Sequence, residues 1–196
     1  MNASPTVILP PQYLGTAGYY ALMASSPVAV IDTAMRYDKR FKSAHRTVIA
    51  GNSGPVTLTV PVTHTPGART WDDVRISSHG HWWTVHTGAI ESAYGRTPYF
   101  EHFFPALQPL LSEKAVGMPV ALFDCIIDAT IRQLLGITTR LSTTTPPGTP
   151  DELIADYRRT PIPDVAPYPQ LRQDTLGFIP SLSVLDPLFN LGALPR

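Results

Sequence analysis

The sequence predicts a single α/β domain in which helices flank a mainly parallel or mixed sheet. The first sign is a strand, helix and strand pattern at the start of the chain, where the apolar runs Thr6–Leu9 and Val28–Ile31 enclose a helical segment. A βαβ unit of this length pairs its strands in parallel. The second sign is size, because 196 residues with 43% hydrophobic content fit one domain with a substantial core.

The composition excludes several functional classes. Lys and Arg balance Asp and Glu at 15 each, so no net positive field attracts nucleic acid. The sequence has no run of about 18 apolar residues that would span a membrane. Its N-terminus lacks the basic and apolar regions of a signal peptide, and the single Cys125 rules out an internal disulfide. These features predict a cytoplasmic protein.

The first part of the chain carries the βαβ pattern. Thr6–Leu9 is a short apolar run that two prolines stop, as suits a buried strand. Thr16–Ser25 has apolar residues at helical spacing and predicts a short helix. Val28–Ile31 is the second strand, and Asp32 follows it directly. Because α/β proteins bind ligands at the carboxyl ends of such strands, this position favours a site.

A hairpin and a helix are predicted next. Thr47–Ala50 and Val56–Val60 flank a Gly-Asn-Ser-Gly sequence, whose residues tolerate the positive φ of a tight turn. Val74–Ser77 is a further short strand. Trp82–Tyr94 has an apolar stripe at helical spacing. His86 lies on that stripe, which is more typical of a core histidine than of a metal ligand.

Two further helix signals follow. Thr97 and Pro98 are the residue types of an N-cap and a first helical position, so a helix is expected to begin there. Met118–Leu135 is the clearest helix, and Gly136 is the type of residue that ends one in a left-handed conformation. Three charged residues recur every four positions on this helix and predict a solvated face: Asp124, Asp128 and Arg132.

A strand and a helix are expected before the C-terminal segment. Ile137–Leu141 is apolar enough for a strand. Thr149-Pro150-Asp151-Glu152 combines an N-cap, a proline at the first helical position and a glutamate at the third. This capping box predicts a helix that runs to about Arg159.

Residues 160–196 are expected to form a Pro-rich C-terminal arm. Pro161–Pro169 carries four prolines, so it does not suit regular secondary structure. Ser181–Leu191 is apolar and predicts a turn or short helix. We expect the arm to pack back on the core, so that residues 1–196 form one domain.

A cluster of cations is the most informative polar feature. The stretch Arg36–Arg46 holds five of the 15 Lys and Arg residues. Guanidinium groups match the oxygens of phosphate and carboxylate, so the stretch is a candidate anion site. A solvated basic loop is the alternative, because runs of charge are often only solvated. His45 lies within the stretch and titrates near neutral pH, which makes it a candidate base.

Several kinds of site are not supported by the sequence. His79, His81 and His86 have the types and spacing of zinc ligands, but no acidic ligand accompanies them at a suitable spacing. Gly-x-Ser-x-Gly, phosphate-binding loop and dinucleotide-binding motifs are absent from the sequence. We therefore expect neither a metal nor a cofactor.

A set of polar residues remains as the candidate site. Its members are Asp32, Lys39, His45, Arg46, Tyr168, Gln170, Asp186 and Asn190. Plain packing is the alternative for Tyr168, Gln170 and Asn190. Asp186 also has two structural explanations, because it could be an N-cap before Pro187 or the third residue of a capping box begun by Ser183.

Short motifs in a fixed order along almost the whole chain carry a family resemblance. The earlier ones are Leu9–Leu14, the Tyr37, Lys39 and Arg46 region leading to Ile49, Leu58–Val62, and Ala93-Tyr94 with Pro98–Phe100. The most specific ones come last, namely Tyr168-Pro169-Gln170, Gly177–Pro180 and Leu182–Asn190. With these motifs the chain resembles the WbqC-like proteins of bacteria. It departs from them in His45, where the family often has Asn, and in a spacing from Lys39 that is one residue longer.

The resemblance implies a role in the biosynthesis of surface polysaccharide, such as O-antigen, and a cytoplasmic location. We expect a transferase-type enzyme that acts on a nucleotide-activated, phosphorylated or otherwise anionic small molecule. Lys39 and Arg46 would hold the anion, and three further residues would contact the substrate: Tyr168, Gln170 and Asn190. One of three residues would act as the general base: His45, Asp32 or Asp186.

Two other functional classes stay open. One is a non-catalytic module that binds a sugar, a lipid head group or a partner enzyme, and the other is a structural subunit of a biosynthetic complex. A deep cleft where Asp32, Arg46, Tyr168 and Asp186 converge would favour the enzyme. A flat apolar surface around the arm would favour binding of a partner enzyme, and association into a homo-oligomer is also open.

Overall fold

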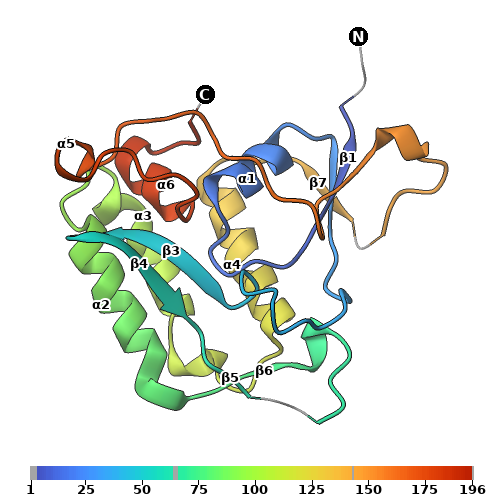
Figure 1. Ribbon diagram of the computed structural model, residues 1–196, viewed down its shortest axis with the longest axis horizontal. Coiled ribbons are helices and arrows are strands. Elements are labelled where there is room, and N and C mark those ends of the chain that lie inside the picture. Colours follow the sequence, from blue (N-terminus) through green and yellow to red (C-terminus); the bar gives the residue numbers. More distant parts are fainter. Residues whose placement is uncertain (1–3, 64–65, 143, 196) are drawn as a thin grey trace.

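The computed structural model describes residues 4–63, 66–142 and 144–195. A four-stranded parallel sheet lies on one side of the molecule, and a two-stranded hairpin with helices lies on the other (Figure 1). Helix α4, Val120–Leu134, lies between these two parts. This arrangement confirms the predicted α/β fold with a parallel sheet and flanking helices.

The parallel sheet has the strand order β7-β2-β1-β8. Its central strands are β1 (Thr6–Leu9) and β2 (Val28–Ile31), which pair in parallel with Val7 opposite Ala29. Every residue of both strands is buried, as expected in a parallel sheet that is covered on both faces. Helix α1, Ala17–Ala24, connects the two strands. The predicted βαβ unit is therefore confirmed.

The edge strands of this sheet differ from the sequence predictions. β7 spans Arg140–Ser142, three residues later than the start of the predicted strand, and pairs with β2. β8 spans Ile154–Asp156 and pairs with β1, so the helix predicted to run to Arg159 is wrong. Only a short 3-10 turn, Asp151–Leu153, follows Pro150. Pairing with a buried strand outweighs the local helix signal, because intrinsic helix propensity is a weak preference.

Two antiparallel pairs complete the strands. β3 (Arg46–Gly51) and β4 (Gly54–Thr59) form the predicted hairpin around Asn52 and Ser53. β5 (Val62–Thr63) and β6 (Arg75–Ile76) form a short second pair.

The helices pack around the hairpin and α4. Helix α2, Trp82–Tyr94, agrees with its prediction at both ends and contacts β3. The others are α3 (Phe100–Leu107), the short α5 (Gln173–Leu176) and α6 (Leu185–Leu191). Four further 3-10 turns are Trp71–Asp73, His79–His81, Gln108–Leu110 and Glu113–Ala115.

The helix ends test two predictions. Gly136 adopts φ 65°, as predicted for a residue that ends α4. Thr97 is not an N-cap, because α3 begins at Phe100. The Thr97 hydroxyl instead donates to the carbonyl of Tyr94 at 2.6 Å, so it satisfies a backbone oxygen at the end of α2.

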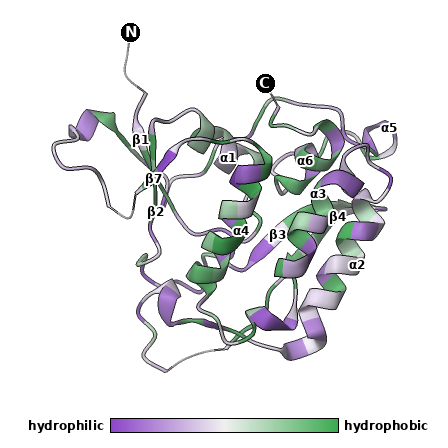
Figure 2. Cartoon of the chain, turned by 180° about the vertical axis from the view of Figure 1, so that it is seen from behind, coloured by the Kyte–Doolittle hydropathy of each residue, from purple (hydrophilic) through white to green (hydrophobic). Residues whose placement is uncertain are grey.

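One hydrophobic core joins the sheet to the hairpin and its helices. Its largest fully buried side chains include Tyr13, Tyr19, Tyr20, Trp71 and Tyr94. Figure 2, which shows the molecule from behind, colours much of α4 and of the sheet strands as apolar. In the part of the chain that the structure describes, no helix is both long and apolar enough to cross a membrane.

The prediction that one face of α4 is solvated is wrong. Asp124 and Asp128 are only 2% and 3% exposed. Asp128 pairs with Arg132 at 2.8 Å, whereas neither carboxyl oxygen of Asp124 has a hydrogen bond from a described residue. Burial raises the pKa of Asp124 well above its usual range. A period of four places these residues on one face but does not reveal that the chain covers this face.

Residues 161–170 have no regular secondary structure, as their prolines predict. They and the following segment contact α1. Ser181 donates to Asp164 at 2.6 Å, and the carbonyl of Leu182 accepts a hydrogen bond from Ala17 at the start of α1. A Cβ at Gly18 would lie 1.9 Å from the carbonyl oxygen of Pro163, so only glycine permits this approach.

Asp124→Asn should stabilise the protein more strongly as the pH rises. The folded-state pKa is raised, so above about pH 4 the unfolded chain releases its proton while the folded chain keeps it. Wild-type stability is therefore fully present below the unfolded pKa and is lost as the pH rises towards the folded pKa. Thermal melts from about pH 4 to about pH 7 should show a growing gain in Tm for the variant. Asp151→Asn, at an exposed carboxylate, is the control without such a trend, and equal midpoints of Asp124→Asn and wild type at every pH would contradict the expectation.

Candidate functional site

An open cleft of about 1350 Å³ lies at the carboxyl edge of the parallel sheet. Asp32 follows β2 and Asp156 ends β8, with β1 between these two strands. The residues that line the cleft come from the segments 32–41 and 156–160. Ligands of open parallel sheets bind at this edge, so the cleft is the candidate site.

Arg158 joins the two strand ends. Its Nη1 lies 2.8 Å from Asp32 Oδ2, and its Nη2 lies 2.6 Å from Asp156 Oδ2. Its Nε donates to Asp156 Oδ1 at 3.0 Å. Hydrogen bonds from Arg158 lower the pKa of Asp156, and the same carboxylates raise the pKa of Arg158. Two carboxylates around one guanidinium leave a formal excess of one negative charge.

The remainder of the cleft is cationic. Five cations and three carboxylates line the whole cleft, a formal excess of two positive charges. Arg40 pairs with Asp38 at 3.0 Å, and this hydrogen-bonded contact lowers the pKa of Asp38 to about 2. No ion pair or side-chain hydrogen bond with a described residue occupies Arg36, Lys39 or Arg159. These three charges are available to an anion.

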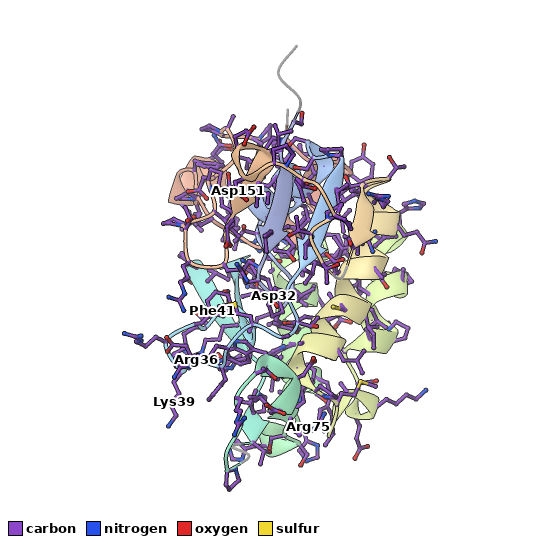
Figure 3. All side chains as sticks on the ribbon, turned by 90° about the vertical axis from the view of Figure 1, so that its right-hand side faces the viewer. Asp32, Arg36, Lys39, Phe41, Arg75 and Asp151 are labelled. Atoms are coloured by element: carbon purple, nitrogen blue, oxygen red, sulfur yellow. The ribbon has the colours of Figure 1, made fainter. Side chains whose placement is uncertain are left out.

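Figure 3 shows how the labelled residues lie on this face of the molecule. Asp32 lies near the middle, and Arg36 and Phe41 lie beside it on the segment that follows β2. Lys39 reaches outward at the edge of the molecule. In this view Lys39 therefore lies on the outer side of the segment, away from Asp32.

An aromatic layer supports the loop of the cleft. Tyr37 and Phe41 pack edge-on against the buried Trp71, with ring centroids 4.8 and 6.2 Å away. The ring of His45 also packs on Trp71, with ring centroids 6.0 Å apart, and its Nδ1 lies 3.1 Å from the carbonyl oxygen of Val60. Burial lowers the pKa of His45, so its ring is neutral at pH 7. His45 thus packs on the same indole as Tyr37 and Phe41 but does not line the cleft.

The start of α1 is occupied by the chain itself. In dinucleotide-binding folds, a phosphate lies at the N-terminus of the first helix. Here the Thr16 hydroxyl caps the helix by accepting from Tyr19. The carbonyl of Leu182 accepts the Ala17 hydrogen bond, and Val184 donates to the carbonyl of Gly15 at 2.8 Å. An anion in the cleft therefore depends on side chains and not on a helix N-terminus.

The structure brings only part of the sequence-predicted set together. Asp32 and Lys39 both line the cleft. Arg46 is exposed at the first residue of β3 and is not among the lining residues. Arg46 begins β3, which belongs to the hairpin and not to the parallel sheet. Sequence spacing does not show how far the hairpin lies from the strand ends of the parallel sheet.

The other predicted residues lie together elsewhere, around α6. Asn190 donates to Asp186 Oδ1 at 3.3 Å within the helix. Burial and the nearby Asp186 raise the pKa of Tyr168. Gln170 bonds Ile179 twice, because its Oε1 accepts from the backbone N–H and its Nε2 donates to the carbonyl, both at 2.9 Å. These four residues do not line the cleft.

Both capping explanations for Asp186 are wrong. Helix α6 begins at Leu185 after Val184, which places Asp186 at the second helical position. The Ser183 hydroxyl accepts from the backbone N–H of Leu185 at 3.3 Å. Asp186 is fully buried, and burial raises its pKa. Its position inside the helix follows from the earlier helix start, which no residue type at positions 183–187 signals clearly.

Sequence reasoning finds Asp32 and Lys39 and misses the other six charged residues of the cleft, namely Arg36, Asp38, Arg40, Asp156, Arg158 and Arg159. The first three lie in the cationic stretch, where the sequence does not show which side chains face the cleft. The last three lie in the segment that the sequence predicts as a helix, which conceals a strand end. The signal was the apolar pair Ile154-Ala155 followed by Asp156, which repeats the pattern of β2 followed by Asp32.

The histidines do not form a metal site with the described residues. Nδ1 of His86 lies 2.8 Å from the Tyr13 hydroxyl, and its Nε2 lies 3.2 Å from the carbonyl oxygen of Thr59. A carbonyl accepts only, so Nε2 carries the proton and Nδ1 accepts from Tyr13. Burial lowers the pKa of His86 to about 4, which keeps this neutral form. No group of three or more potential metal ligands is present among the described residues.

The chain was also compared with known proteins. The model of the WbqC-like protein family matches residues 10–160. No curated protein and no solved structure shows significant similarity to the chain. The matched span includes every residue that lines the cleft and ends before Tyr168, Gln170, Asp186 and Asn190.

Gln170→Met should separate a structural role from a substrate-binding role. Methionine is of similar size but leaves both backbone groups of Ile179 without their partner. An unsatisfied buried group costs about 1–3 kcal/mol, which lowers Tm by roughly 2–4 °C per kcal/mol in a chain of this size. Differential scanning calorimetry measures this loss, and Gln108→Met at an exposed glutamine is the control. An unchanged midpoint for Gln170→Met would show that the side chain is not a structural bridge.

Proposed function

The chain belongs to the WbqC-like protein family, and we propose that it is a transferase-type enzyme of bacterial surface-polysaccharide biosynthesis, such as that of O-antigen. Its substrate is a phosphorylated, nucleotide-activated or otherwise anionic small molecule bound in the cleft. A cytoplasmic location and assembly with itself or with a partner enzyme are parts of the same proposal.

One observation carries the proposal of an anionic substrate. Arg36, Lys39 and Arg159 line one cleft and have no ion pair with a described residue. The cleft as a whole has a formal excess of two positive charges in a chain whose net charge is zero, which favours an anion there. An anionic ligand would neutralise this excess. Arg36 and Arg159 can contact two oxygens of one phosphate, whereas Lys39 contributes a point charge at the rim.

The roles proposed for the three candidate bases differ with their positions. Asp32 is the one that lines the cleft, and its carboxylate is fixed by Arg158. In the proposed reaction Asp32 orients or deprotonates an acceptor group beside the bound anion. His45 and Asp186 are buried and lie outside the lining, so we give the role at the substrate to Asp32.

A non-catalytic binding module is the second candidate. The observation that favours it is the pairing of the cleft carboxylates, since Asp32 and Asp156 contact Arg158 and Asp38 contacts Arg40. A paired carboxylate is a weak proton acceptor, because the ion pair stabilises its charged form. Binding without turnover of nucleotide sugars and sugar phosphates would support the module. Release of the free phosphate or nucleotide would support the transferase.

Lys39→Gln and Arg159→Gln should each weaken the binding of pyrophosphate by about tenfold, equivalent to about 1.4 kcal/mol. Each change removes one cation that is available to the anion while keeping a polar side chain of similar length. Isothermal titration calorimetry measures the effect, which should shrink as the salt concentration rises because salt screens exposed charges. Lys114→Gln is the matched control, since Lys114 is exposed and does not line the cleft. Equal loss in the control, or no binding by wild type, would refute the anion site.

A further inference from the structure

One carboxylate oxygen of Asp32 is bound by Arg158, and the other has no hydrogen bond within the described part of the chain. Its Oδ2 accepts from Arg158 Nη1 at 2.8 Å. Its Oδ1 receives no hydrogen bond from the described residues. The side chain is 21% exposed, and it lines the cleft. An ionised carboxylate only accepts hydrogen bonds, so Oδ1 is open to a donor from solvent or from a ligand.

The position of Asp32 restricts what that donor is. Asp32 follows the second strand of a βαβ unit, next to the end of β1. In nucleotide-binding sheets, an acid in this place accepts hydrogen bonds from sugar hydroxyl groups. The first turn here has no glycine-rich fingerprint, and the chain fills the start of α1. The similarity to nucleotide-binding sheets is therefore limited to the acidic residue after the second strand and does not include their phosphate site.

The cleft combines carboxylates at the sheet edge with cations on the segments that follow the strands. The sheet edge has Asp32 and Asp156 around one guanidinium, with a net negative charge. The unpaired cations Arg36, Lys39 and Arg159 come from the segments that follow these strands. A ligand that carries both a phosphate and hydroxyl groups would match the cations and the acceptor of Asp32.

We propose that the cleft selects a phosphorylated sugar, with a sugar hydroxyl group donating to Asp32 Oδ1 and the phosphate lying against Arg36, Lys39 and Arg159. This inference rests on the proposed anion site and names its substrate class. The sugar is either the ribose of a nucleotide or the glycosyl unit of a sugar phosphate, because both present the same chemistry. Arg158 is a positioning residue, since it holds Asp32 by Oδ2 and directs Oδ1 to the ligand.

Two pairs of probes with equal charge test the proposal by isothermal titration calorimetry. Uridine diphosphate is compared with its 2′,3′-dideoxy form, and glucose 1-phosphate is compared with cyclohexyl phosphate. Within each pair the phosphate is the same and the hydroxyl groups are removed. In wild type we expect about a tenfold preference for the hydroxyl-bearing member of at least one pair. The pair that shows it identifies the ribose or the glycosyl unit as the ligand.

Asp32→Ala should reduce this preference to less than about twofold. It should not weaken the hydroxyl-free probe of the same pair, because the change removes a negative charge and frees one nitrogen of Arg158. A residue that only held Arg158 in place would instead affect both members of a pair equally. Asp38→Ala is the control, since it removes a carboxylate from the same cleft but not from the sheet edge. The preference of this variant for the hydroxyl-bearing probe should stay at the wild-type value.

The outcomes are separable. If hydroxyl-free probes bind to wild type and the hydroxyl groups add nothing, or if Asp32→Ala keeps the preference, the sugar inference fails and the anion site stands. If no probe binds to wild type, the proposed function and this inference both fail. Should Asp32→Ala not fold by circular dichroism, Asp32→Asn replaces it. Asparagine keeps the size but has one acceptor oxygen, which Arg158 would occupy, so its NH2 group would face the ligand and most of the preference should be lost. Full retention would overturn the proposal.

Discussion

The loop between β1 and α1, residues 10–16, is the constraint on which the rest of the structure depends. Leu14 adopts φ 46°, a left-handed conformation that costs a residue other than glycine about 1–2 kcal/mol. Its carbonyl oxygen accepts from the hydroxyl groups of Thr47 and Ser183, both at 2.9 Å. Two net hydrogen bonds of about 1 kcal/mol each offset that cost. One backbone oxygen thereby ties the βαβ unit to the hairpin and to the C-terminal segment.

The same loop determines where a ligand can bind. The backbone N–H of Tyr13 donates to the carbonyl of Ser43, and its hydroxyl contacts His86 in α2. These contacts bury the loop, so its backbone is not available to a phosphate as it is in glycine-rich phosphate loops. The sheet nevertheless keeps its open carboxyl edge. For the anion that we propose, contacts would therefore come from the long cationic side chains after β2 and β8.

Local patterns predicted the elements whose own residues determine them. The βαβ unit, the hairpin, α2 and α4 have strong apolar periodicity or turn residues, so they could be predicted from sequence. Strand β8 has three residues, and its ladder hydrogen bonds come from pairing with β1, which the sequence does not show. The capping box before it therefore led to a helix prediction. Asp32 could be placed at the sheet edge because a strand precedes it. Arg158 and Arg159 were missed because their position follows from that long-range pairing.

The prediction that Asp124 lies on a solvated face was wrong for a related reason. Its spacing with Asp128 and Arg132 is typical of a solvated helix face, and only the fold shows that the chain covers it. A buried carboxyl group without a hydrogen bond is costly when ionised, so the folded state favours its neutral form.

The acidic residues discussed above thus fall into two kinds, those paired with a cation at the surface and those buried in the core. At the cleft, Arg158 pairs with Asp32 and Asp156 at a surface that solvent reaches, and its hydrogen bonds lower the pKa of Asp156. Around α6 and α4, burial raises the pKa of Asp186 and Asp124 and opposes their ionisation. The family match covers the whole cleft and ends at residue 160, before the α6 cluster begins. Asp32 is partly exposed and lines the cleft, whereas Asp186 is buried and its ionisation is opposed, so the ligand chemistry that we propose lies at the sheet edge. Near α6, two hydrogen bonds between Gln170 and Ile179 tie parts of the C-terminal segment together.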